Sequence, residues 1–127
     1  MLNNYIDDNE KLYRSVPKNP DLWETKFNRP SSGFFSNPDG ISVDRDGGRN
    51  EQKIIKDFDE RYPDRGLVSL IAKACREIGT KPVAKPLKDN VYHAEIHDDD
   101  GSIIIKSRSK RRKLAIACKI VKYPFPE

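Results

Sequence analysis

Residues that could bind an anion are spread over the first hundred positions of the chain. They combine two guanidinium groups, two hydroxyls, a carboxylate and an imidazole: Arg14, Arg29, Ser31, Ser32, Asp44 and His93. Guanidinium groups bind carboxylate or phosphate through paired hydrogen bonds. If the sheet brings these segments together, segment 29–45 forms one wall of a cleft for an anionic small molecule or a partner's acidic group, Arg14 its floor and the His93 strand its opposite wall. Alternatively, Arg29 and the serines stabilise their own loop by pairing with Asp44 and backbone groups.

Two further groups could support catalysis or metal binding. His93, Glu95 and His97 alternate along an expected strand and therefore share one face. A strand rises about 3.3 Å per residue, so His93 and His97 lie roughly 13 Å apart, too far to bind one metal together. We therefore assign no metal and no cofactor, and keep His93 and Glu95 as catalytic candidates. The alternative is a solvated face on which Glu95 pairs with Lys106.

A basic run near the C-terminus could bind phosphate or nucleic acid. It comprises Lys106, Arg108, Ser109, Lys110, Arg111 and Arg112, with Lys113 next in sequence. Ser109 is an expected helix N-cap, which would place three cations in the first helical turn, where the helix dipole disfavours them. A bound anion would relieve this repulsion. The alternative is that the run is solvated or pairs with the chain's own acidic residues.

Length, charge and cysteine content restrict the class of protein. The 127 residues carry a net charge of +4, of which residues 101–127 contribute +7 and the first hundred −3. One domain over 1–127 is expected, with a loose start at 1–10 and a tail at 123–127. Two cysteines without CxxC spacing favour a reducing cytoplasm over a disulfide or a zinc ribbon. No signal peptide and no apolar run of membrane-spanning length is recognisable, so we expect no contact with a membrane.

Hydrophobic periodicity predicts an α+β fold. Apolar residues at helical spacing predict helices over 50–61, 67–78 and 110–122, with Asn50 as an N-cap and Gly79 as a C-cap. Alternation predicts strands over 12–16 and 41–45, a proline-bounded edge strand over 81–85, and a hairpin of 91–97 with 102–107. We expect a mixed or antiparallel sheet of four to five strands packed by about three helices. Arg14 either faces this core with a partner or lies on an edge strand and reaches water.

Several motifs resemble those of small uncharacterised bacterial proteins. They are Leu12-x-Arg14-x-Val16-Pro17, Arg29-Pro30-Ser31-Ser32-x-x-Phe35, Ile41-Ser42-Val43-Asp44, Gly66-Leu67, Arg76-Glu77-x-Gly79 and Pro86-Leu87-x-x-Asn90-x-x-His93-Ala94-Glu95. The resemblance spans most of residues 11–121 and implies a bacterial single domain without implying an activity. The order Arg14, Ser31–Ser32, Glu95 is also similar to the Arg, Ser, Glu order of ADP-ribosyltransferase-type domains, although the spacing departs from theirs.

Three functions follow from these observations. The leading expectation is a non-enzymatic cytoplasmic module that recognises a protein partner or an anionic ligand through its Arg, Ser and His side chains. The alternative is a nucleic-acid-binding protein that uses the basic run over 106–113. The second alternative is a small enzyme acting on a nucleotide or a phosphate-containing substrate.

Overall fold

The computed structural model describes residues 2–125 and is built around one antiparallel sheet. Within that range the sheet has six strands in the order β6-β7-β4-β1-β5-β8. Their bounds are β1 Lys11–Val16, β4 Ile41–Arg45, β5 Gly66–Ile71, β6 Thr80–Ala84, β7 His93–Asp98 and β8 Lys119–Lys122. Two short strands, β2 (Trp23–Glu24) and β3 (Arg29–Pro30), pair separately. β1 therefore lies in the middle of the main sheet.

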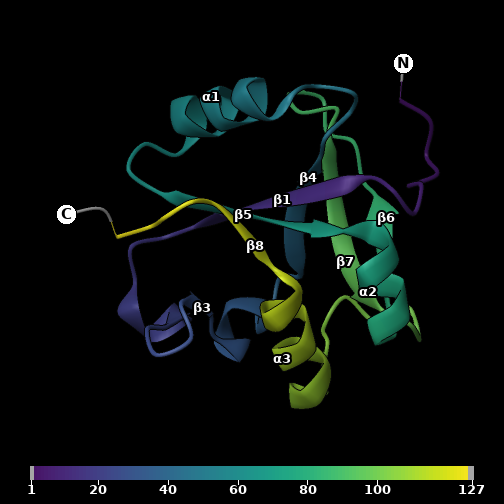
Figure 1. Ribbon diagram of the computed structural model, residues 1–127. Coiled ribbons are helices and arrows are strands. Elements are labelled where there is room, and N and C mark those ends of the chain that lie inside the picture. The colour runs from purple at the N-terminus through teal and green to yellow at the C-terminus, as the bar shows by residue number, and fades with distance from the viewer. Residues whose placement is uncertain (1, 126–127) are drawn as a thin grey trace.

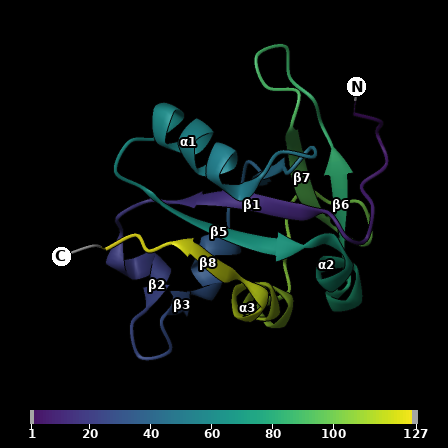
Figure 2. The same cartoon turned by 45° about the horizontal axis from the view of Figure 1, so that its top comes forward.

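Helices cover the two faces of the sheet unequally. Helix α1 (Glu51–Arg61) lies over one face, whereas α2 (Ala72–Ile78) and α3 (Arg108–Ala117) lie on the other, as Figure 1 shows. The short 3-10 turns η1 (Pro20–Leu22) and η2 (Ser32–Phe35) precede β2 and β4 respectively, and η2 packs against α3. Turning the molecule brings α1 and the long connection between β6 and β7 into the foreground (Figure 2). Each face of the sheet is thus covered by at least one helix (Figure 1).

The alternation of side chains along β1 divides the core into two parts. Leu12 and Val16 point into the larger core beneath α2, α3 and η2, where they are fully buried. Tyr13 points to the other face, where it packs with Ile54 and Phe58 of α1. Its hydroxyl donates a 3.0 Å hydrogen bond to Glu51. Burial raises the pKa of Tyr13, and this hydrogen bond raises it further. One strand thus anchors both layers.

The α+β class and several local predictions are confirmed. Helix α1 begins after Asn50, whose side chain accepts a hydrogen bond from the Lys53 N–H. Gly79 ends α2 at a φ of 98°, which favours glycine. Strand β6 lies at the edge of the sheet, as expected for a segment that contains Pro82. None of the helices within residues 2–125 has the length and apolar character to cross a membrane.

Two predicted helices were wrong in part, and the sheet is consequently wider than the expected four to five strands. The helix over 67–78 is strand β5 followed by α2, because Leu67 and Val68 bury side chains on opposite faces of the sheet. Such two-sided burial gives a continuous apolar run whose spacing also fits a helix. The helix over 110–122 ends at Ala117, and its last part forms strand β8.

The predicted hairpin of 91–97 with 102–107 was also wrong. Strand β7 pairs with β6 and β4 instead, so Ile96 faces Pro82 and Ile41 rather than Ile105, and the predicted pairing of Glu95 with Lys106 does not form. The turn at Gly101 forms, but the chain leaves the sheet after it and enters α3. Because both edges of β7 were already satisfied, segment 102–107 had no strand to pair with.

Gly66, the first residue of β5, provides a stability prediction. A Cβ atom there would lie 2.7 Å from the Cα of Pro124 and 2.8 Å from the carbonyl oxygen of Lys122. Because both contacts are backbone atoms, Gly66→Ala is expected to lower the unfolding free energy by about 1–3 kcal/mol. Urea denaturation measures this. Gly33→Ala is the control, because its nearest contact would be 3.6 Å away and its effect should be much smaller.

Candidate functional site

The candidate site lies where the hydrogen-bond ladder between two central strands ends. Strand β1 pairs with β5 along six residues, from Lys11 to Val16, but with β4 only at Leu12 and Tyr13. Beyond Tyr13, β1 and β4 separate, while β4 remains paired to β7 down to Ile41. Separated strands leave backbone carbonyl groups without ladder partners. A side chain from one of the strands can fill such a gap.

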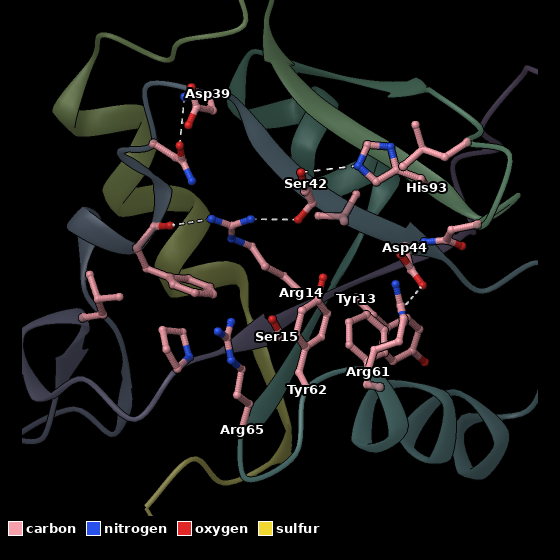
Figure 3. A pocket seen from close by; sticks show the side chains of 18 of the residues that line it. Tyr13, Arg14, Ser15, Asp39, Ser42, Asp44, Arg61, Tyr62, Arg65 and His93 are labelled. Carbon is pink, nitrogen blue, oxygen red and sulfur yellow. Dashed lines mark hydrogen bonds and ion pairs between the residues drawn. The ribbon is translucent and has the colours of Figure 1, made fainter.

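Arg14 fills this gap and forms the floor of the site, as Figure 3 shows. One terminal nitrogen of its guanidinium donates to the Ser42 carbonyl oxygen at 2.8 Å and the other to the Phe34 carbonyl oxygen at 3.2 Å. The guanidinium carbon lies 4.7 Å from the centre of the Phe34 ring. Arg14 is thus held by carbonyl groups and an aromatic face, on an inner strand rather than at an edge.

The charge of Arg14 is not neutralised by any carboxylate of the described residues. Among residues 2–125 no carboxylate forms an ion pair with it, and its Nε is buried without a hydrogen-bond partner. Burial lowers the pKa of Arg14 to about 10, so the guanidinium remains protonated at neutral pH. A desolvated cation with spare N–H donors is a binding point for an anion.

A cleft of about 740 Å³ opens above Arg14. Its lining comes from β1, η1, η2 with the segment that follows it, β4, the C-terminal end of α1, the connection between β6 and β7, and the start of β7. The charged and imidazole side chains in this lining are Arg14, Arg61, Arg65, Asp39, Asp44, Asp89 and His93, and its aromatic side chains are Tyr13, Phe34, Phe58 and Tyr62. Mixed aromatic and polar linings of this size are typical of small-molecule sites.

The other two arginines of the cleft differ in whether their charge is paired. Arg61 donates to the buried carboxylate of Asp44 at 2.6 Å, and the Asn90 amide donates to the same carboxylate at 3.0 Å. Arg65 stacks on Tyr62, 5.0 Å from the ring centre, and forms no ion pair within the described part of the chain. Asp44 is thereby satisfied, and within residues 2–125 Arg14 and Arg65 form no ion pair, although the carboxylates of Asp39 and Asp89 lie elsewhere on the same lining.

His93 and Ser42 approach each other on the same wall of the cleft (Figure 3). His93 Nδ1 lies 2.9 Å from the Lys85 carbonyl oxygen, and His93 Nε2 lies 3.4 Å from Ser42 Oγ. Since a carbonyl oxygen only accepts hydrogen bonds, Nδ1 carries the proton in the neutral imidazole. Nε2 then presents a lone pair toward the Ser42 hydroxyl.

The structure brings only part of the predicted recognition surface together. Arg14, Asp44 and His93 line the cleft, whereas Arg29, Ser31 and Ser32 do not. Arg29 pairs with Glu24 at 3.3 Å in the small β2–β3 sheet, and the Ser31 hydroxyl donates to the Asp21 carbonyl oxygen. Ser32 begins η2. Arg29 and Ser31 thus stabilise their own loop, although with Glu24 and Asp21 rather than Asp44.

Sequence reasoning did not identify three functional candidates, Arg61, Arg65 and Asn90. Arg61 is the last residue of α1 and Arg65 lies in the turn before β5, so neither belongs to an alternating strand pattern. Asn90 lies in the connection between β6 and β7, next to its β-bridge with Leu87. The usable signal was the frequency of arginine beside aromatic residues over 58–65, which favours stacked guanidinium groups.

The catalytic candidates His93 and Glu95 make separate contacts. Glu95 accepts from His97 Nε2 at 2.7 Å, while His93 turns toward Ser42. No group of three His, Cys, Asp or Glu side chains within residues 2–125 is close enough to hold a metal ion. Because Ser31 and Ser32 lie outside the cleft, the Arg, Ser, Glu order noted in the sequence is not assembled through these serines.

Part of the basic run is bound by the protein itself. Ser107, not Ser109, caps α3. Lys110 pairs with Asp98 at 2.7 Å and Asp99 at 3.3 Å, and its hydrogen bond holds the pKa of Asp98 below the usual value. Arg111 donates to the carbonyl oxygens of Ile105 and Lys106. Lys106, Arg108, Ser109, Arg112 and Lys113 remain exposed.

The cleft therefore combines an unneutralised guanidinium at its floor, a second cation at its rim and a polar wall that carries Ser42 and His93. These features distinguish it from the exposed basic surface of α3, where two of the cations are already used for internal contacts. Comparisons with protein-family models, with curated proteins and with solved structures give no match.

Proposed function

We propose that the protein is a binding module that takes up an anionic ligand in the cleft above Arg14. The observation that carries this proposal is the desolvated guanidinium of Arg14, which has no ion pair among residues 2–125 and keeps unused N–H donors on its two terminal nitrogens. An uncompensated buried charge destabilises a fold by about 3–5 kcal/mol. A ligand carboxylate or phosphate would offset this loss and accept from the remaining N–H groups of the terminal nitrogens.

The composition of the cleft limits the kind of ligand. A volume of about 740 Å³ suits a small molecule or one or two side chains of a partner, rather than a folded domain. Arg14 and Arg65 favour an anionic group, while Tyr62 and Phe34 offer apolar contact. Asp39 and Asp89 lie on the same lining and repel additional negative charge elsewhere in the ligand. A compact anionic group, either alone or at the end of an otherwise uncharged ligand, fits this arrangement.

Calorimetric titration tests the proposal with two probes, pyrophosphate and citrate, at low ionic strength. We expect at least one of them to bind with a stoichiometry of one and with affinity that decreases as salt is added. Arg29→Met provides the matched control, because Arg29 pairs with Glu24 outside the cleft, and its binding should equal that of the unchanged protein. If neither probe binds, or if Arg29→Met weakens binding as much as Arg14→Met, the proposal is wrong.

A second candidate function, nucleic-acid binding, is favoured by the exposed cations at the start of α3. Lys106, Arg108, Arg112 and Lys113 are exposed and form no ion pair within residues 2–125. Four phosphate contacts would give a plot of log affinity against log salt a slope of about −3 for single-stranded RNA. Fluorescence anisotropy with a labelled oligonucleotide measures this slope. Arg108→Gln combined with Arg112→Gln should bring it to roughly half, and absence of binding at low salt would contradict this function.

A further inference from the structure

The wall of the cleft carries a hydroxyl and an imidazole in the arrangement of a nucleophile and its base. Ser42 Oγ is 3.4 Å from His93 Nε2, and the opposite ring nitrogen is fixed 2.9 Å from the Lys85 carbonyl oxygen. This second contact leaves Nε2 as the hydrogen-bond acceptor in the neutral ring. In acyl transfer, serine is activated by a histidine whose other ring nitrogen is held in place by a third group.

The surroundings leave Ser42 accessible to a substrate. Ser42 is exposed, it lines the cleft, and its side chain lies on the sheet face away from the larger core. Its own carbonyl oxygen accepts the 2.8 Å hydrogen bond from Arg14. The anion-binding guanidinium is therefore next to the residue that would attack. A substrate held at Arg14 by an acidic group would bring the rest of its chain past the Ser42 hydroxyl.

We propose that Ser42 and His93 hydrolyse carboxylic esters whose acyl chain ends in an anionic group. The proposal rests on the proposed function, because Arg14 is the group that would hold this anionic end. Ser42 would act as nucleophile and His93 as general base, and both would touch the reacting atoms.

The reaction balances with water as the only co-reactant. Ser42 Oγ forms a bond to the ester carbon while His93 Nε2 takes the hydroxyl proton, and this proton passes to the departing alkoxide as its C–O bond breaks. Water then gives a proton to Nε2 and attacks the acyl-serine. The acyl–Oγ bond breaks, the acid is released, and Ser42 recovers its proton from His93.

Two esters of equal acyl length test the proposal, the mono-para-nitrophenyl ester of adipic acid and para-nitrophenyl hexanoate. The protein is expected to release para-nitrophenol from the adipate ester with the higher kcat/KM, because only this ester carries a terminal carboxylate. Ser42→Ala and His93→Ala should each lower kcat by about 100-fold or more. Arg14→Met should raise KM for the adipate ester about tenfold or more and leave the hexanoate ester unaffected.

Controls separate this inference from the binding proposal. Ser102→Ala, in the turn after β7, should leave hydrolysis unchanged, and circular dichroism melting should show that the Ser42 and His93 variants remain folded. A fluorophosphonate probe should label the peptide that contains Ser42. Binding of pyrophosphate or citrate without any Ser42-dependent release of para-nitrophenol would overturn the catalytic pair alone. A different result would overturn the anion site and support the catalytic pair. In that result, neither probe binds, and hydrolysis depends on Ser42 but is unchanged by Arg14→Met.

Discussion

Replacement of Arg14 by methionine is expected to weaken the binding of pyrophosphate or citrate by about 10- to 150-fold. This range corresponds to the roughly 1.5–3 kcal/mol that a charge-assisted hydrogen bond contributes. Methionine replaces the aliphatic part of the arginine side chain, but it carries no charge and no donor. The calorimetric titration described above gives the affinity of both proteins.

The stability of the same variant separates a binding role from a structural one. Arg14→Met removes a desolvated cation that has no ion pair among residues 2–125, and it gives up two hydrogen bonds to the carbonyl oxygens of Ser42 and Phe34. Two such charge-assisted bonds contribute about 3–6 kcal/mol together, which is close to the roughly 3–5 kcal/mol that an unpaired desolvated charge costs. The ligand-free variant should therefore unfold at a urea concentration close to that of the unchanged protein. A clear loss of stability would identify Arg14 as a structural residue.

Replacement of Arg45 by methionine is expected to lower the unfolding free energy by about 3–5 kcal/mol. Arg45 is 3 % exposed, and its guanidinium donates twice to the Glu10 carboxylate and once each to the carbonyl oxygens of Asn3 and Tyr5. Its hydrogen bonding to Glu10 raises the pKa of Arg45 and outweighs the opposing effect of burial. Unlike Arg14, this arginine pairs with a carboxylate, and its loss leaves that carboxylate and two carbonyl groups without their donors.

Lys122→Met is the control for Arg45. Lys122 pairs with Asp59 at 2.7 Å, as closely as Arg45 pairs with Glu10, but both side chains are more than one third exposed. An exposed pair contributes less than about 1 kcal/mol. Urea denaturation measures both variants. The account of Arg45 would be contradicted if the two changes were equal, or if Glu10→Met restored nothing when combined with Arg45→Met.

The local chemistry of the fold could be predicted from the sequence, whereas the pairing of strands could not. The Asn50 cap, the Gly79 ending and the proline-bounded edge strand depend on neighbouring residues alone, and all three are found. The error at Leu67 and Val68 arose because a strand buried on both faces has no polar alternation. The partner of β7 was missed because a tight turn at Gly101 predicts a hairpin, while β6 and β4 had already occupied both edges.

The candidate site was predicted in part for the same reason. Asp44 and His93 are register partners on β4 and β7 and share a face, as alternation predicts, whereas Arg14 alternates with Leu12 and Val16 and lines the cleft because β1 and β4 separate beside it. Arg29 and Ser31 belong to an irregular loop whose path depends on Trp23, Phe34 and Phe35 packing into the core. The distance from this loop to the sheet is a tertiary property that no local pattern contains. Arg65 was not predicted because it lies in a turn, where no alternation indicates the direction of a side chain.

The most direct measurement for the anion site is a nitrogen-15 NMR titration of the arginine Nε–H signals with pyrophosphate. Two arginine Nε atoms within residues 2–125 are buried without a hydrogen-bond partner, those of Arg14 and Arg111, and only Arg14 lines the cleft. We predict a saturable shift of the Arg14 Nε–H signal while the Arg111 signal stays in place. A titration in which both signals move together, or in which Arg14 does not respond at concentrations that saturate calorimetric binding, would contradict the assignment of this cleft as the anion site.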